Sequence, residues 1–174
     1  MLAGRDLDSA METHDAIYAI WRKYGALPER FLLQGNQIHS TERYYPLRPE
    51  FVESTYYLYR ATGHPYFLQV SVCSSSTVFD TFSSGLWCGQ VGKDIYKSLE
   101  SVTRVANGYA SVRNVGTGEL EDRMTSFFLA ETCKYLYLLF DEDNFLHKGD
   151  RTYVFSTEGN ALAYCLPADT LTLD

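Results

Sequence analysis

Apolar side chains recur at helical spacing in three stretches of the chain. The first, residues 6–24, ends at Gly25, a typical helix C-cap residue. The second, residues 48–59, has Pro49 where the first turn of a helix tolerates proline, followed by a broad apolar band. The third, residues 126–140, is apolar almost all round, which predicts the longest helix and one packed between other helices. These patterns predict a mainly helical chain.

Shorter patterns lie between and after these stretches. Residues 26–42 form a polar run that predicts a loop, and a further helix is expected to begin near Pro65. Residues 110–115 are β-like and precede a glycine-rich turn. Residues 152–156 (TYVFS) have the composition of a short strand that runs into a turn at 157–159.

One segment interrupts the helical pattern. Residues 71–90 are rich in serine and glycine, unlike the residues on either side. If Gln69 were joined directly to residue 91, four apolar side chains would fall on one helical face: Tyr66, Val91, Ile95 and Leu99. We therefore interpret residues 71–90 as an insertion that splits one helix, and the alternative is an ordinary loop between two short helices.

Composition narrows the class of protein. At 174 residues and 45% hydrophobic content the chain can bury the core of one domain, and its 15% aromatic content suits a site that stacks on sugars or other rings. A net charge of −7 without a basic run argues against a nucleic-acid partner.

No stretch approaches the roughly 20 apolar residues that span a bilayer, and the first ten residues lack the apolar core of a signal peptide. The four cysteines have no metal-binding spacing and permit disulfides without requiring them: Cys73, Cys88, Cys133 and Cys165.

Two acids at the start of the second helix are candidates for chemistry. Glu50 and Glu53 are three residues apart, so both project from one face of the first turn, where the helix dipole favours negative charge. Acids are also common there as capping or solvent-exposed residues. The spacing alone leaves both interpretations open.

The other candidates lie in the third helix and after the strand. An ionised Glu131 in an apolar helix costs several kcal/mol unless it is compensated, and either Lys134 or a polar cavity could compensate it. Thr157 and Glu158 offer hard oxygen ligands of the kind that Ca²⁺ prefers, although such a pair is also common in simple turns.

Three segments carry a family resemblance. In order, YPLRPEFVESTYYLYRATG, EDRMTSFFLAETCKYLYLLF and YVFSTEG closely resemble the C-terminal part of the class I α-1,2-mannosidases, glycoside hydrolase family 47. Their wording, with WRKYGALPERF at residues 21–31, is most similar to the endoplasmic-reticulum degradation-enhancing α-mannosidase-like branch. The resemblance covers nearly the whole chain apart from residues 71–90 and the last few. It implies that residues 1–174 form the C-terminal part of an all-α catalytic domain, a partial (α/α)7 barrel (helical toroid) with a short C-terminal β-hairpin.

The resemblance also implies roles for individual residues. Glu50 resembles the catalytic base that activates water, and Glu53 lines the same pocket. The substrate-binding residues would be Arg48, Phe127 and Glu131. Thr157 resembles the direct Ca²⁺ ligand, through its carbonyl and hydroxyl oxygens. Glu158 resembles an acid that binds the ion through its waters rather than directly. The family's next residue is usually histidine, whereas this chain has Asn160, and Ala163 stands where proline is frequent.

Together these features predict a fragment or truncated isoform of a Ca²⁺-dependent α-1,2-mannosidase. Its expected partners are high-mannose N-glycans on misfolded glycoproteins, and its expected compartment is the endoplasmic reticulum. Inverting glycosidases need a carboxylic acid besides the base, and the family's acid belongs to an N-terminal half that is not in this sequence. The isolated chain is therefore expected to be inactive. The alternatives are a non-catalytic glycan-binding or adaptor protein and a plain helical interaction module.

Overall fold

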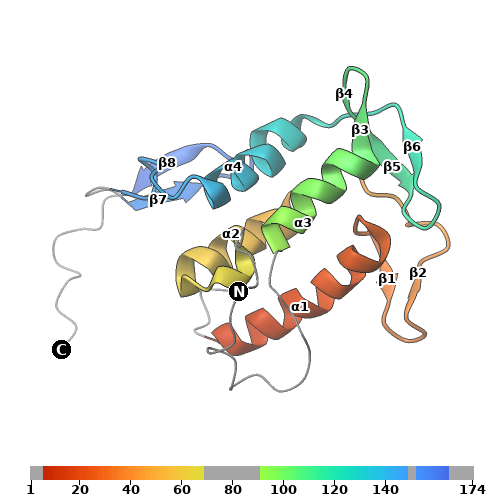
Figure 1. The fold of residues 1–174 in the computed structure, drawn as a ribbon, viewed down its shortest axis with the longest axis horizontal. Coiled ribbons are helices and arrows are strands. Elements are labelled where there is room, and N and C mark those ends of the chain that lie inside the picture. Colours follow the sequence, from red (N-terminus) through yellow and green to blue (C-terminus); the bar gives the residue numbers. More distant parts are fainter. Residues whose placement is uncertain (1–5, 69–90, 149–151, 165–174) are drawn as a thin grey trace, which may run out of the picture.

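The computed structural model of the protein describes residues 6–68, 91–148 and 152–164, and their helices pack around one central helix (Figure 1). The α-helices in these residues are α1 (Leu7–Tyr24), α2 (Glu50–Thr62), α3 (Val91–Ser98) and α4 (Lys134–Phe140). A 3₁₀-helix, η2 (Pro65–Phe67), follows α2, and two π-helical segments adjoin α3 and α4, namely η3 (Leu99–Thr103) and η4 (Phe128–Cys133). The central helix is α2, which contacts α1, α3 and α4.

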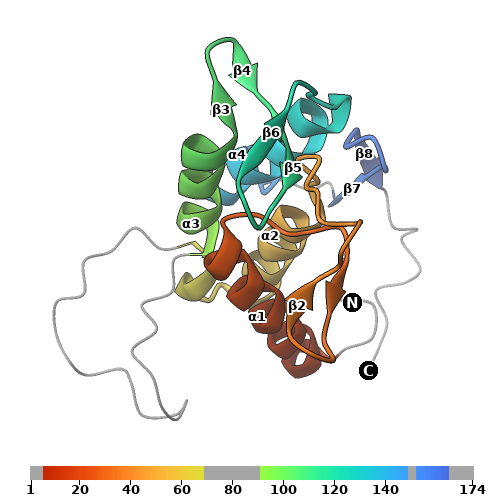
Figure 2. The same ribbon diagram turned by 90° about the vertical axis from the view of Figure 1, so that its right-hand side faces the viewer.

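Four antiparallel hairpins complete the described part of the chain. They pair β1 (Phe31–Leu32) with β2 (Gln37–Ile38), β3 (Arg104–Val105) with β4 (Gly108–Tyr109), β5 (Ser111–Asn114) with β6 (Glu119–Glu121), and β7 (Thr152–Phe155) with β8 (Ala161–Tyr164). The β1–β2 hairpin lies in the segment 26–42 that was predicted to be a loop, and strands of two residues are too short to leave an alternating pattern. This hairpin folds back beside α1, where the rings of Tyr24 and Phe31 are 6.4 Å apart (Figure 2).

The predicted first helix is confirmed almost to the residue. The carboxylate of Asp6 accepts a hydrogen bond from the backbone N–H of Ser9 (3.0 Å), which caps the N-terminus of α1. Gly25 adopts the left-handed conformation after the helix, and its N–H donates to the carbonyl of Trp21 (2.7 Å). The buried face of α1 is made by Ala10, His14, Tyr18 and Trp21.

The predicted apolar band of α2 forms the middle of the core. Its buried members are Phe51, Val52, Thr55, Tyr56 and Leu58. Phe51 stacks on Trp21 (ring centroids 5.6 Å apart) and on His14 (4.8 Å), so aromatic rings fill the space between α1 and α2. Pro49 is the N-cap residue rather than part of the first turn, so the helix begins at Glu50.

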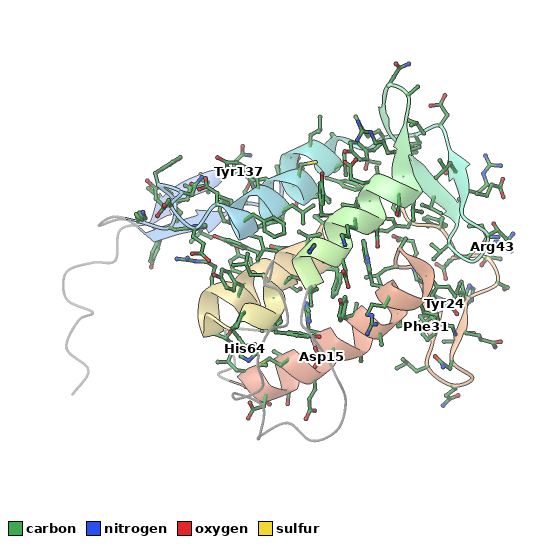
Figure 3. All side chains as sticks on the ribbon, in the orientation of Figure 1. Asp15, Tyr24, Phe31, Arg43, His64 and Tyr137 are labelled. Atoms are coloured by element: carbon green, nitrogen blue, oxygen red, sulfur yellow. The ribbon has the colours of Figure 1, made fainter. Side chains whose placement is uncertain are left out.

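The segment 126–140 differs from its prediction in two respects. It is helical throughout, but α1, with 18 residues, is longer. It also packs on one side only, because Leu129 and Tyr137 are 61% and 62% exposed, and Tyr137 points away from the helices (Figure 3). Apolar residues therefore cover a face that nothing in the described residues buries.

The other predictions have mixed outcomes. The helical class and the C-terminal β-hairpin are confirmed, whereas the described helices do not by themselves form a closed barrel. Of the four residues in the joined-helix pattern, Val91, Ile95 and Leu99 are buried and Tyr66 is partly buried. The segment 71–90 lies outside the described residues, so its interpretation as an insertion stays a prediction. In the described part of the chain, no helix is long and apolar enough to cross a membrane.

Candidate active site

A strained turn leads into α2 and fixes where its first residues lie. Leu47 is fully buried and has a φ of +64°, which costs a bulky residue about 1–3 kcal/mol. Its carbonyl accepts a hydrogen bond from the Thr132 hydroxyl (2.9 Å), and the carbonyl of Pro46 accepts one from the Thr125 hydroxyl (3.0 Å). Both threonines belong to the segment that contains η4 or leads into it. These two hydrogen bonds thus fix the position of the start of α2 relative to η4.

Arg48 follows this turn and pairs mainly with Glu29. Its guanidinium makes two hydrogen bonds to the carboxylate of Glu29, at 2.5 and 3.0 Å, and these raise the pKa of Arg48. Nη1 of Arg48 is 4.0 Å from Oε1 of Glu50, and Cζ of Arg48 is 5.8 Å from the ring centroid of Phe127. The structure therefore brings Arg48, Glu50 and Phe127 together, with the Glu50 side chain 65% exposed.

Glu53 lies one turn further along α2. Its Oε1 accepts a hydrogen bond from the buried Tyr135 hydroxyl (3.0 Å) at the start of α4. Burial raises the pKa of Tyr135, and the neighbouring Tyr57 and Glu53 raise it further. Tyr135 thus stays a neutral donor that joins Glu53 to the helix carrying Glu131.

Glu131 lies within electrostatic range of the other predicted acids. Its pKa is raised, first by partial burial and then by the negative charges of Glu53, Glu158 and Glu50, whereas Lys134 lowers it. Of the two predicted forms of compensation, the structure shows Lys134, whose charge favours the ionised form of Glu131. The polar cavity stays a prediction. Glu131 lies in the π-helical η4, and such irregular turns are frequent at functional sites. We call Glu50, Glu53, Glu131 and Glu158 the acid cluster.

The tip of the β7–β8 hairpin is docked on η4. Gly159 is buried with a φ of +71°, and a Cβ atom built on it would lie 2.6 Å from the Ala130 carbonyl and 3.1 Å from Cγ of Glu131. The Gly159 carbonyl accepts a hydrogen bond from the Lys134 ammonium. This contact brings Glu158 near Glu131 of the acid cluster, and Glu158 and its neighbour Thr157 are both exposed.

The tip carries oxygen atoms of the kind that Ca²⁺ prefers as ligands. No hydrogen bond within the described residues engages the hydroxyl or carbonyl oxygen of Thr157. Hard oxygens beside several carboxylates suit Ca²⁺, because the cation would offset the repulsion that raises the pKa of Glu131. In the described ranges, no three His, Cys, Asp or Glu side chains are arranged to hold a metal by themselves. The Ca²⁺ site that the family resemblance implies at Thr157 and Glu158 therefore stays a prediction.

An apolar cavity adjoins the acid cluster. It has a volume of about 520 Å³ and lies between α1 and α2. Glu50 contributes to its wall, and the remaining lining is largely apolar: Ala10, His14, Ile17, Leu27, Phe51, Ser54, Tyr57 and Leu58. Glu50 thus borders both the acid cluster and this apolar cavity.

Comparison with known proteins identifies the family. A sequence model of glycosyl hydrolase family 47 matches residues 2–83 and 87–164. The chain belongs to this family. Alpha-mannosidase I MNS5 from Arabidopsis thaliana is 47% identical over 157 residues, which cover 90% of this chain and 23% of that protein. The human ER degradation-enhancing alpha-mannosidase-like protein 2 is 40% identical over 149 residues, which cover 85% of this chain and 22% of that protein.

A solved structure supports the same assignment. The alpha-1,2-mannosidase from Trichoderma reesei superposes with a TM-score of 0.52 and 29% sequence identity, covering 71% of this chain and 22% of that one. The family 47 chain described here thus spans between a fifth and a quarter of the length of these relatives.

Several site residues were not found from the sequence. Lys134 was considered only as an ion partner of Glu131, whereas it also bonds the hairpin tip. Glu29 and Tyr135 were missed because their partners are 19 and 82 residues away. Leu47 was missed because no local signal predicts a positive φ for leucine. The individual roles of the predicted residues stay predictions.

Proposed function

We propose that this chain supplies the catalytic-base side of a Ca²⁺-dependent, inverting α-1,2-mannosidase site that trims mannose from high-mannose N-glycans. The observation that carries the proposal is the meeting of the acid cluster with the hairpin tip, which unites residues from α2, η4 and the β7–β8 turn. Membership of family 47 supports the reaction class. Because the chain spans less than a quarter of its relatives, substrate and pathway are part of the proposal.

Each residue then has a chemical task. Glu50, which projects into solvent from the first turn of α2, accepts a proton from the water that attacks the anomeric carbon. Phe127 offers a ring for the apolar face of the sugar, and Glu131 accepts hydrogen bonds from sugar hydroxyls. Thr157 would hold Ca²⁺ through its carbonyl and hydroxyl oxygens, with Glu158 binding the ion's waters, and the bound ion would orient sugar hydroxyls.

The proposal includes a barrel and a cellular role. The helices around α2 would form part of an (α/α)7 toroid that other parts of the family's domain complete. The names of several relatives refer to ER degradation, so we place the protein's work in the endoplasmic reticulum, on glycans of misfolded glycoproteins. The general acid would come from outside these 174 residues, and the chain alone would not release mannose.

Calorimetric titration of the 174-residue chain with 1-deoxymannojirimycin tests the site. We expect binding in millimolar Ca²⁺ that is lost in excess EGTA. Glu50→Gln should weaken binding about tenfold or more, since a hydrogen bond to a charged group contributes about 1.5–3 kcal/mol. Glu12→Gln, at an exposed position of α1, is the matched control and should bind like the wild type.

Other results would contradict specific parts of the proposal. Binding that is equally strong in Ca²⁺ and in EGTA would favour a calcium-independent glycan-binding protein. The absence of binding in both buffers would favour a helical interaction module. Ca²⁺-dependent release of mannose from a high-mannose glycan by the purified chain would show that the acid is present after all.

A further inference from the structure

We propose that Lys134 is a positioning residue that latches the β7–β8 hairpin tip onto η4 and so sets where Thr157 and Glu158 lie. The importance of that position rests on the proposed function, in which these two residues form the ion site. The latch itself is a statement about the geometry of this chain and can be tested without metal.

Lys134 contacts the hairpin at two separate points. Its ammonium donates a hydrogen bond to the carbonyl of Gly159, just after the turn. The same ammonium lies 4.5 Å from the ring centroid of Phe155, the last residue of β7, and 5.0 Å from that of Tyr135. Phe155 also meets Tyr135 edge-on, with centroids 5.7 Å apart. One side chain of the helix thus holds both arms of the turn.

The geometry of Gly159 shows how closely the two elements approach. Its left-handed φ of +71° and the 2.6 Å between a built Cβ and the Ala130 carbonyl leave no room for a side chain. Only a glycine lets the Lys134 ammonium reach the backbone carbonyl here. The fit between helix and hairpin is therefore specific to this pair of residues.

The charge of Lys134 could instead serve only to neutralise acids. Burial lowers the pKa of Lys134, although Glu131 and Glu53 act in the opposite direction. Neutralisation alone, however, requires neither the bond to Gly159 nor the contact with the Phe155 ring. A variant that keeps the stem and removes the ammonium separates the two roles, because only latching predicts a change at the hairpin tip.

Hydrogen exchange of the metal-free 174-residue chain tests the latch. Lys134→Met retains the apolar stem and removes the donor. We expect the amides of Gly159 and Asn160, which bond to Ser156, to exchange about tenfold faster or more, in line with the loss of a charge-assisted hydrogen bond. Amides of α2 and α4 should exchange as in the wild type. Lys134→Arg, which can still donate to a carbonyl, should restore most of the protection.

A matched control and a second readout complete the experiment. Lys23→Met removes an ammonium that lies 4.9 Å from the Tyr24 ring, at the end of α1 away from β7 and β8 (Figure 1), and should leave the tip unchanged. In the same variants, Ca²⁺ titration should show an affinity at least tenfold weaker for Lys134→Met than for Lys23→Met.

Each outcome is decisive. Unchanged exchange at Gly159 in Lys134→Met would overturn the latch. Equal acceleration in α2 and α4 would overturn it as well, because the lysine would then be a general structural residue. A wild-type chain that shows no Ca²⁺ affinity would contradict the proposed ion site, while the exchange data would still decide the latch.

Discussion

At the scale of single residues, His14 is a buried imidazole whose surroundings select its neutral form. It is 3% exposed, and its Nε2 is 2.9 Å from the Thr55 hydroxyl, which donates its own proton to the Phe51 carbonyl (2.8 Å). Nε2 must therefore carry the proton in this bond. Burial lowers the pKa of His14 to about 4, although Asp15, 3.8 Å from Nδ1, acts in the opposite direction.

This histidine gives the fold a predictable dependence on pH. Because its pKa is about 4 when folded and 6.5 unfolded, the unfolded chain binds more protons between these values, so stability falls as the pH falls. Lowering the pH from 7 to 5 should remove about 2 kcal/mol through His14. His14→Gln keeps a donor for Thr55 but does not titrate. In urea titrations at pH 7 and pH 5, the free energy of unfolding of His14→Gln should fall by about 2 kcal/mol less than that of the wild type. Equal losses in the two proteins would contradict the prediction.

At the scale of elements, two glycines end the two long helices in the same way. Gly25 and Gly63 have φ values of +75° and +62°, and each donates its N–H to a carbonyl of the last turn at 2.7 Å. They differ in what surrounds them. A Cβ on Gly25 would lie 3.1 Å from the Val102 side chain, whereas one on Gly63 would meet nothing within 4 Å.

The pair separates backbone strain from packing. Gly63→Ala should cost about 1–2 kcal/mol, the penalty of a left-handed residue with a side chain. Gly25→Ala should cost more, because Val102 must move as well. Urea midpoints with an unchanged m-value measure both losses, and equal losses would show that the contact with Val102 relaxes freely.

The same elements show what a sequence can predict. The end of α1 and the start of α2 were predictable because their signals, Gly25 and Pro49, are local. The acids of the candidate site were named from their motifs, and their roles stay predictions. The positive φ of Leu47 was not, since it depends on a hydroxyl 85 residues away, and the π-helical form of η4 has no sequence signal that we recognised. Long-range contacts therefore account for most of what was missed.

At the scale of the whole molecule, the proposed ion site couples metal binding to stability. The acid cluster has members in α2, η4 and the hairpin, so a cation at Thr157 would offset their repulsion and stabilise contacts between three elements. A ligand at one hundred times its Kd adds about 2.7 kcal/mol to the free energy of unfolding, which for a chain of this size raises the Tm by roughly 5–10 °C.

Thermal unfolding with and without Ca²⁺ measures this coupling. The Tm should rise in Ca²⁺ and return to its metal-free value when EGTA is added. Thr157→Ala changes an exposed residue, so it should leave the metal-free Tm nearly unchanged and abolish the rise. A Tm that is the same in Ca²⁺ and EGTA would argue against an ion site in this chain.

The docked hairpin tip also has a consequence for the order in which the protein is made. Glu50 precedes Gly159 by about a hundred residues, and ribosomes add roughly 5–20 residues per second, so Glu50, the proposed base, is made many seconds before the tip can reach η4. Until then the left-handed turn at Leu47 and the exposed acids have no hairpin beside them. A nascent chain that is halted before Gly159 can therefore contain folded helices and still have no assembled site.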